Sequence, residues 1–234
     1  MNAKKIYTGI ILLVTFFVIL FLIFMPIFGQ GRNGLQFADD FFNSLSKYSS
    51  NQMAAMAKLA KGLEGQTFSV SIKPASAAVA PKVALLYTKA GAEVVPDGEK
   101  LTISGDLGKI LSRVVVDSEN MFNNQGDKLV AEYNYDAKSV MRNWWTSLGK
   151  IGTALNKQQH FKMAKAIETI QTRAIEPGYN FYGIAASSVA DNIALLSFML
   201  IFYIVYTLWY GYGIFELFEG IGLGMHKGAS KEEV

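Results

Sequence analysis

The segment IYTGIILLVTFFVILFLIFMPIF, residues 6–28, decides how this chain is built, because it contains no charged side chain. Lys4 and Lys5 precede it and Arg32 follows it. The hydrocarbon core of a bilayer is about 30 Å thick, and a helix with a rise of 1.5 Å per residue needs about 20 apolar residues to cross it. We therefore predict a transmembrane helix over residues 6–28.

A cleaved signal peptide is the alternative interpretation of residues 6–28, with Lys4 and Lys5 as its basic start. The apolar run is, however, longer than the roughly 7–15 residues typical of such a signal. Its exit, MPIFGQ at residues 25–30, also lacks small residues at the spacing of a cleavage site. We expect the segment to be retained as a membrane anchor.

A second apolar segment, NIALLSFMLIFYIVYTLWYGYGIF at residues 192–215, is predicted to be another transmembrane helix. Amphipathic aromatic rings favour the headgroup level of a bilayer. Aromatic residues lie at both ends of this segment and are candidate membrane-interface or interaction residues: Tyr179, Phe181 and Tyr182 ahead of it, and Trp209, Tyr210 and Tyr212 at its far end.

Glu216 and Glu219 follow the second apolar segment and share one face of a helix. They are candidates for binding a cation or a basic loop of a partner. Solvated charges at headgroup level are the more ordinary interpretation of such a pair.

The orientation of the chain follows from the residues beside the two spans. Residues 1–5 contain two lysines and no acid, which predicts a cytoplasmic amino terminus. Two spans return residues 216–234 to the same side as a cytoplasmic tail. Residues 29–191 are then expected to form a periplasmic or extracellular domain of a protein in the cytoplasmic (inner) membrane.

The composition excludes several kinds of chemistry. The chain has no cysteine, which excludes disulfides, cysteine zinc sites, iron–sulfur clusters and covalently attached haem. Its two histidines, His160 and His226, lie outside the spans, so a bis-histidine haem in the membrane is excluded as well. The net charge of +3 is too small and dispersed for a nucleic-acid-binding protein. We expect no cofactor and no metal.

The first half of the central domain alternates between helix and strand patterns. Apolar residues recur at helical spacing over 35–63, which predicts one long amphipathic helix. Residues 67–122 then read as strand, helix, two strands joined by a turn, and a helix capped by Asp106. This βαββα order makes an α+β domain and most of a split βαβ unit, the ferredoxin-like arrangement.

The second half of the domain is predicted to be helical, with one ambiguous segment. Residues 129–135 have no clear period and fit a last strand or a short helix equally well. Residues 136–176 read as a helical hairpin that begins at the capping residue Asp136 and breaks near residues 156–159. We expect the hairpin to lead into the second span.

Trp144 and Trp145 are the two remaining candidate interaction residues. Neighbours on a helix point about 100° apart, so both can be partly buried or one can face a partner. We expect at least one of them to be buried.

The sequence shows no nucleophile placed beside a base, which disfavours an enzyme. We expect a non-catalytic accessory, scaffold or assembly subunit of a membrane protein complex, whose partners are the lipid bilayer and either another protein or further copies of itself. The alternative is a ligand-sensing ectodomain coupled to a separate signalling protein.

Overall fold

The computed structural model describes residues 2–223, which fall into two compact units. The first unit comprises residues 2–45 and 187–223, and the second comprises residues 46–186. Residue 1 and residues 224–234, which hold His226 and the end of the predicted tail, lie outside the described residues.

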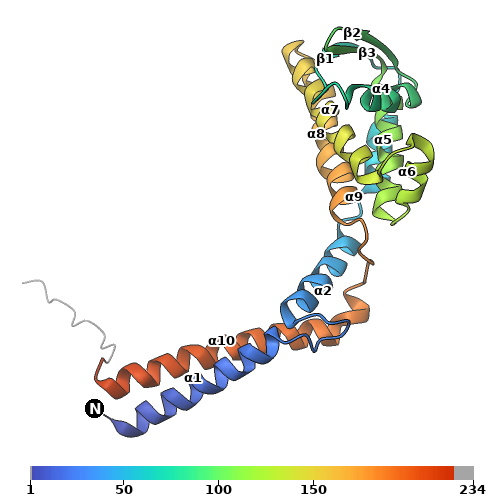
Figure 1. The fold of residues 1–234 in the computed structure, drawn as a ribbon. Coiled ribbons are helices and arrows are strands. Elements are labelled where there is room, and N and C mark those ends of the chain that lie inside the picture. The colour runs from blue at the N-terminus through green and yellow to red at the C-terminus, as the bar shows by residue number, and fades with distance from the viewer. Residues whose placement is uncertain (1, 224–234) are drawn as a thin grey trace, which may run out of the picture. The chain divides into compact units, whose positions relative to one another are not determined.

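Two long helices make up most of the first unit. Helices α1 (Ala3–Phe24) and α10 (Ile193–Ile221) lie side by side (Figure 1), and a short 3-10 helix, Ala190–Asn192, precedes α10. They run antiparallel, since the Asn2 amide donates to the Gly220 carbonyl oxygen at 2.8 Å. Both are long and apolar enough to cross a membrane, and almost none of their apolar windows is buried within the protein.

The ends of these helices differ from the expected spans of 6–28 and 192–215. Helix α1 ends at Phe24, because Met25 precedes Pro26 and takes the extended backbone that proline imposes on the residue before it. Helix α10 continues to Ile221 and ends where Gly222 adopts a φ of 90°.

Glycines allow the two helices of the first unit to approach closely. A Cβ atom on Gly9 would lie 2.7 Å from the Leu217 backbone nitrogen, and one on Gly220 would lie 2.8 Å from the Ile6 backbone nitrogen. Such distances exclude any larger residue without a shift of the backbone. Small residues at helix contacts are the usual means of close packing in membranes.

The structure has two helices where the sequence predicts one over residues 35–63. Helix α2 (Gly34–Ser49) ends before Ser50-Asn51-Gln52, and α3 (Met53–Lys61) begins after it. The Asn51 side chain accepts a hydrogen bond from the Met53 amide, and the Ser50 hydroxyl bonds the Lys47 carbonyl. These local bonds compete with the helical ones, which explains the break.

A three-stranded antiparallel sheet forms part of the second unit, as expected. Its strands are β1 (Thr67–Ile72), β2 (Glu93–Asp97) and β3 (Lys100–Asp106), in the order β1-β3-β2. Helix α4 (Ala80–Lys89) connects β1 to β2, with Pro81 in its first turn, where no donor is needed. Because both outer strands are antiparallel to β3, they run parallel to each other.

The two edge strands of the sheet, β2 and β1, each have a feature that alters their free backbone groups. Strand β2 contains Pro96, a residue that sheets accept at an edge because the outward-facing nitrogens do not bond the neighbouring strand. On β1, the Ser69 carbonyl oxygen accepts a hydrogen bond from the Gln158 side chain at 3.3 Å.

Six helical segments complete the second unit: α5 (Leu107–Phe122), α6 (Gly126–Tyr133), α7 (Ala137–Lys157), α8 (Phe161–Ile170), the π-helix η1 (Gln171–Ile175) and α9 (Glu176–Asn180). The predicted caps are confirmed, since the carboxylates of Asp106 and Asp136 accept backbone amides of α5 and α7. The ambiguous segment 129–135 is largely helical, in α6. The described residues therefore contain no fourth strand of a ferredoxin-like sheet.

The helical hairpin predicted to end at residue 176 continues to Asn180. Pro177 lies in the first turn of α9, where its missing amide costs nothing, so it does not end the helical path. The π-helix η1 joins α8 to α9.

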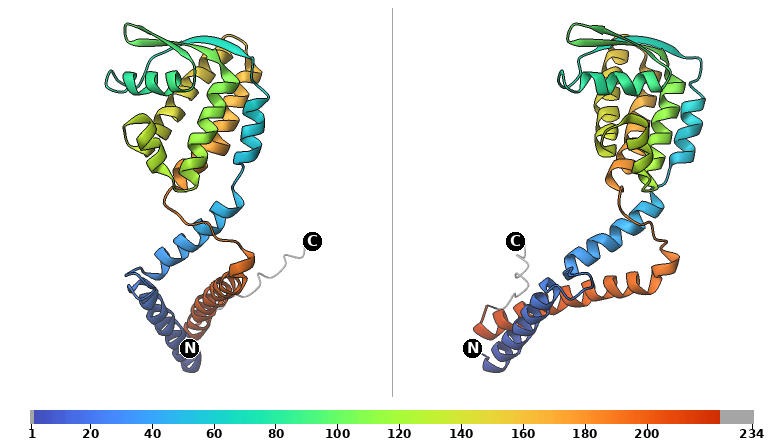
Figure 2. Two further views of the ribbon diagram at one scale, coloured as in Figure 1. Left: turned by 90° about the vertical axis from the view of Figure 1, so that its right-hand side faces the viewer. Right: turned by 45° about the vertical axis from the view of Figure 1, so that its right-hand side comes forward.

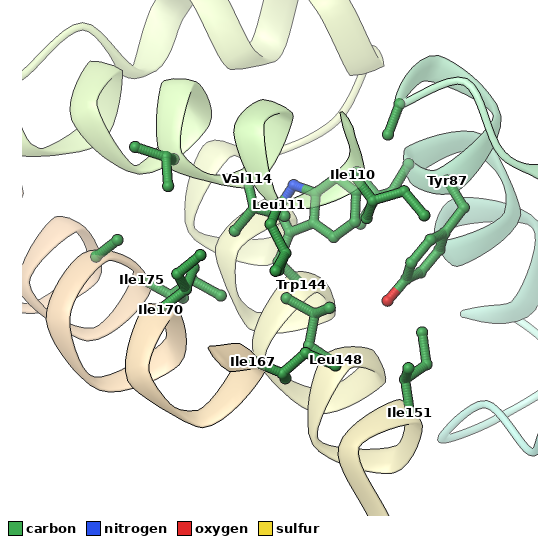
Figure 3. Packing of buried hydrophobic residues seen from close by; sticks show 14 of the residues in the cluster. Tyr87, Ile110, Leu111, Val114, Trp144, Leu148, Ile151, Ile167, Ile170 and Ile175 are labelled. Atoms are coloured by element: carbon green, nitrogen blue, oxygen red, sulfur yellow. The ribbon is translucent and has the colours of Figure 1, made fainter. Parts of the chain in front are cut away.

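The core of the second unit lies among these helices and the inner face of the sheet, which extends across one end of the helices (Figure 2). Inward residues alternate along β1, where Phe68, Val70 and Ile72 are buried. Figure 3 shows Trp144 of α7 surrounded by apolar side chains of α5 and α8, with Tyr87 of α4 nearby.

Candidate functional site

A buried carboxylate, Asp117 of α5, is the most unusual group in the core of the second unit. Its side chain is almost completely buried. One oxygen, Oδ2, accepts hydrogen bonds from Tyr133 Oη of α6 at 2.5 Å and from Trp144 Nε1 of α7 at 2.9 Å. Asp117 therefore joins three helices.

The second oxygen of Asp117 faces a cation. Arg113 Nε lies 3.1 Å from Asp117 Oδ1 and donates a hydrogen bond to Tyr133 Oη at 3.0 Å. Burial raises the pKa of Asp117 above its ordinary value, although the hydrogen bonds and the guanidinium act against this shift. Burial also raises the pKa of the Tyr133 hydroxyl, and the Asp117 charge adds to that effect.

This cluster extends from Asp117 to Trp144 and Tyr87. Trp144 is completely buried, packs edge-on to Tyr87 at 5.0 Å between ring centroids, and donates its indole N–H to Asp117. The Tyr87 hydroxyl in turn donates to Ser147 Oγ at 2.9 Å. Asp117 Oδ1 meets Arg113 as an ion pair but accepts no hydrogen bond among the described residues. The hydrogen-bonded groups Tyr133 and Trp144 fix how the three helices pack. Of the two tryptophans, only Trp145 can contact a partner.

A buried lysine secures the segment that follows α9. The Lys47 ammonium donates to the carbonyl oxygens of Ile184 at 2.6 Å and Phe181 at 3.1 Å, and to Asn124 Oδ1 at 3.2 Å. It also lies 5.1 Å from the centre of the Phe122 ring. No carboxylate pairs with it among the described residues, and burial lowers its pKa.

A hollow of about 350 Å³ lies on the surface of the second unit, and it brings two predicted site residues together. We call it the Trp145 hollow. It is lined by residues of α7, η1 and α9: Met141, Arg142, Trp145, Ile175, Glu176, Tyr179 and Asn180. Trp145 is 39% exposed, so its ring is only partly covered by protein.

Local packing holds the walls of the Trp145 hollow in place. The Gln171 side chain of η1 donates to the Trp145 carbonyl oxygen at 2.8 Å, which fastens the π-helix to α7. Gly178 lets α9 lie against α5, because a Cβ atom there would come within 2.7 Å of the Ser118 carbonyl oxygen. Short π-helical segments inside α-helices are frequent at functional sites.

Charged and hydroxyl groups meet at the rim of the Trp145 hollow. Arg142 Nη2 donates to Tyr179 Oη at 3.2 Å, and the Lys138 ammonium lies 5.8 Å from the centre of the Tyr179 ring. Arg142 and Glu176 are both exposed, and neither forms an ion pair among residues 2–223.

The other predicted aromatic residues near α9 pack against the second unit. Phe181 meets Phe122 edge-on, with ring centroids 6.1 Å apart. Tyr182 packs beside Gly126, because a Cβ atom on Gly126 would lie only 2.5 Å from the Tyr182 hydroxyl oxygen. Both are partly buried, so neither lines the Trp145 hollow.

The predicted residues of α10 lie in the first unit. Trp209 Nε1 donates to the Leu12 carbonyl oxygen of α1 at 3.1 Å, and Tyr210 lies against Phe16 with ring centroids 4.8 Å apart. Tyr212 is exposed and stacks on Phe215.

The two acidic residues at the end of α10 have different surroundings. Glu219 forms an ion pair with Lys5 of α1, whereas Glu216 is 8% exposed. No group of three potential metal ligands gathers anywhere in the described part of the chain.

Sequence reasoning missed Asp117, Lys47 and Arg142. An aspartate among the apolar residues of the predicted helix 107–122 is a signal that could have marked Asp117 as buried. Nothing comparable marks Lys47 or Arg142, because lysines and arginines on amphipathic helices normally face solvent.

Comparison with known proteins gives no match to this chain, whether to family models, to curated proteins or to solved structures.

Proposed function

We propose that the chain is a two-pass protein of the cytoplasmic (inner) membrane, and that it acts as a non-catalytic accessory, scaffold or assembly subunit of a membrane protein complex. One observation supports the proposal above all. Helices α1 and α10 pack on each other through glycines, while nearly all of their apolar surface is left uncovered by protein. Lipid is the medium that such surfaces require.

In this proposal residues 29–191, which include the second unit, form the extracytoplasmic domain, and both termini are cytoplasmic. The lysines at residues 4 and 5 support the orientation. The sheet order supports a relation to the ferredoxin-like arrangement, in which a fourth strand would lie beside β1.

The buried polar groups favour a role in binding rather than in catalysis. The hydrogen bonds of Asp117 and Tyr133 join helices, and neither residue lines the Trp145 hollow. Tryptophan, tyrosine and arginine are the residues that most often dominate protein interfaces, and Trp145, Tyr179 and Arg142 occur together on the surface.

Native gel analysis after extraction in a mild detergent tests the subunit role. An affinity-tagged full chain should migrate as part of a larger assembly, and mass spectrometry of that band should identify the other component. An untagged strain provides the control for adventitious binding. Migration as a lone monomer would contradict the proposal, and a band containing only this chain would restrict the partner to further copies of itself.

The second candidate function is a ligand-sensing ectodomain, which the Trp145 hollow favours. Its volume of about 350 Å³ falls in the range of small-molecule sites. In this candidate function the ectodomain is coupled to a separate signalling protein. A ligand that binds the folded state raises its stability by mass action, so a thermal-shift screen tests this function.

A further inference from the structure

The Trp145 hollow has an uneven distribution of chemical groups. Most of its wall is apolar or aromatic, from Met141, Trp145, Ile175 and Tyr179. Small-molecule sites combine such a wall with a few polar groups that orient the ligand. Here those groups include one cation and one anion.

The two charges in the hollow come from different helices and do not neutralise each other. Arg142 belongs to α7 and Glu176 begins α9. Both line the same space, yet no ion pair joins them. The hydrogen bond to Tyr179 Oη uses one guanidinium nitrogen, Nη2, and holds the Arg142 side chain against the aromatic wall.

A ligand with a single charge fits this arrangement poorly. A simple carboxylate would meet the Glu176 charge, and a simple amine would meet the Arg142 charge, and like charges a few ångströms apart repel. A molecule with both charges and an apolar group would satisfy Arg142, Glu176 and the aromatic wall together.

We propose that the Trp145 hollow binds a small zwitterion with an apolar side chain, the chemical class of the apolar α-amino acids. The ligand carboxylate pairs with Arg142 and its ammonium pairs with Glu176, while its side chain lies against Trp145 and Tyr179. This inference rests on the second candidate function, ligand binding, and it is independent of the subunit role.

Isothermal titration of the full chain in detergent tests the proposal, with L-leucine, L-methionine and L-phenylalanine as probes. At least one of them should bind. For L-phenylalanine, two matched analogues separate the charges: 3-phenylpropionate lacks the ammonium and 2-phenylethylamine lacks the carboxylate. Each analogue should bind about tenfold more weakly or worse, the loss expected for one charge-assisted hydrogen bond. For a probe other than L-phenylalanine, the corresponding deaminated and decarboxylated analogues serve.

Two substitutions locate the binding in the hollow. Arg142→Gln and Glu176→Gln should each weaken binding about tenfold and leave the melting temperature unchanged, because both side chains are exposed. The controls Arg173→Gln and Glu168→Gln remove charges outside the hollow and should bind as the parent does. Binding should change tryptophan fluorescence in the parent and leave it unchanged in Trp145→Phe.

Three results would overturn the proposal: no binding of any of the three amino acids at millimolar concentration, equal binding of an amino acid and its singly charged analogues, or full affinity in both Arg142→Gln and Glu176→Gln. The native gel result does not depend on any of these measurements. Failure of the zwitterion site would therefore leave the subunit role standing.

Discussion

At the scale of single residues, the buried Asp117 joins three helices of the second unit. It accepts hydrogen bonds from two other helices through one oxygen and faces Arg113 with the other. Removing one partner of a buried charged cluster is costly, because the remaining groups keep their desolvation penalty without their partner.

Replacing Asp117 with alanine should destabilise the protein by about 3 kcal/mol, since Tyr133 Oη and Trp144 Nε1 would lose their acceptor in the core. For a unit of this size the melting temperature, followed by tryptophan fluorescence, should fall by roughly 10 °C. Glu119→Ala removes an exposed acid from the same helix and should change little. Equal effects of the two substitutions would contradict a structural role of Asp117.

The raised pKa of Asp117 also predicts how stability depends on pH. The folded state holds this proton more tightly than the unfolded state, so the free energy of unfolding falls as pH rises from the ordinary value of 3.8 through the raised value. The lowered pKa values of Asp106 and Asp136 act in the opposite sense and below that window.

Melting temperatures of the parent and of Asp117→Asn, measured from about pH 4 to neutrality, isolate this contribution because the asparagine does not titrate. The parent should lose stability relative to the variant as pH rises. A constant difference between the two curves would show that burial does not raise the pKa of Asp117.

At the scale of elements, the pair α1 and α10 makes a precise geometric prediction. A Cβ atom on Gly213 would lie 3.3 Å from the Leu12 Cβ atom, slightly closer than the roughly 3.5–4.5 Å found in disulfides. The chain has no cysteine of its own. Leu12→Cys combined with Gly213→Cys should therefore crosslink within one chain when membranes are oxidised.

The matched control for this crosslink is Leu12→Cys with Tyr212→Cys, because Tyr212 is 55% exposed and points away from its neighbour by about 100°. Leu12→Cys with Gly213→Cys should form the disulfide, detected as faster migration on a denaturing gel without reductant, and the control pair should not. Equal crosslinking of both pairs would contradict the packing of α1 on α10.

An element can be predicted from the sequence when the residues that determine it are neighbours in the chain. The caps Asp106 and Asp136 and the first strand of the βαββα order rest on neighbouring residues, and the structure agrees with these predictions. Neighbouring residues also cause the break between α2 and α3 at residues 50–52. It was not predicted, because the apolar residues on both sides of it follow one continuous helical period.

The remaining features depend on residues that are distant in the sequence. Residues 126–133 form a helix rather than a strand because Leu129 and Tyr133, one turn apart, both reach the core. The Trp145 hollow forms only where α7 and α9 come together. The π-helix between α8 and α9 is five residues long, too short to show a recognisable sequence pattern. Of the hollow's lining residues, only Trp145 and Tyr179 were candidates from the sequence.

At the scale of the whole molecule, the exposed apolar surfaces of α1 and α10 predict behaviour in membrane fractions. Alkaline carbonate should leave the chain in the membrane pellet, because it strips proteins held only by surface charges. Combining Ile11→Arg with Ile201→Arg should reduce retention, at a cost of about 3 kcal/mol for each arginine near the centre of a span. Val95→Arg, at an exposed apolar residue of the sheet, should be retained like the parent. Release of the parent by carbonate would contradict membrane insertion.

Pro96 in strand β2 has a consequence for how copies of this protein behave when crowded. A complex or a membrane patch places many copies at high local concentration, where the open edge of one sheet can recruit the edge of another. Strand β2 lacks one amide donor at Pro96, and on β1 the Gln158 side chain already occupies the Ser69 carbonyl oxygen. Neither edge strand therefore offers a complete row of free backbone donors and acceptors to another strand. This protects the small sheet against the edge-to-edge association that leads to aggregation.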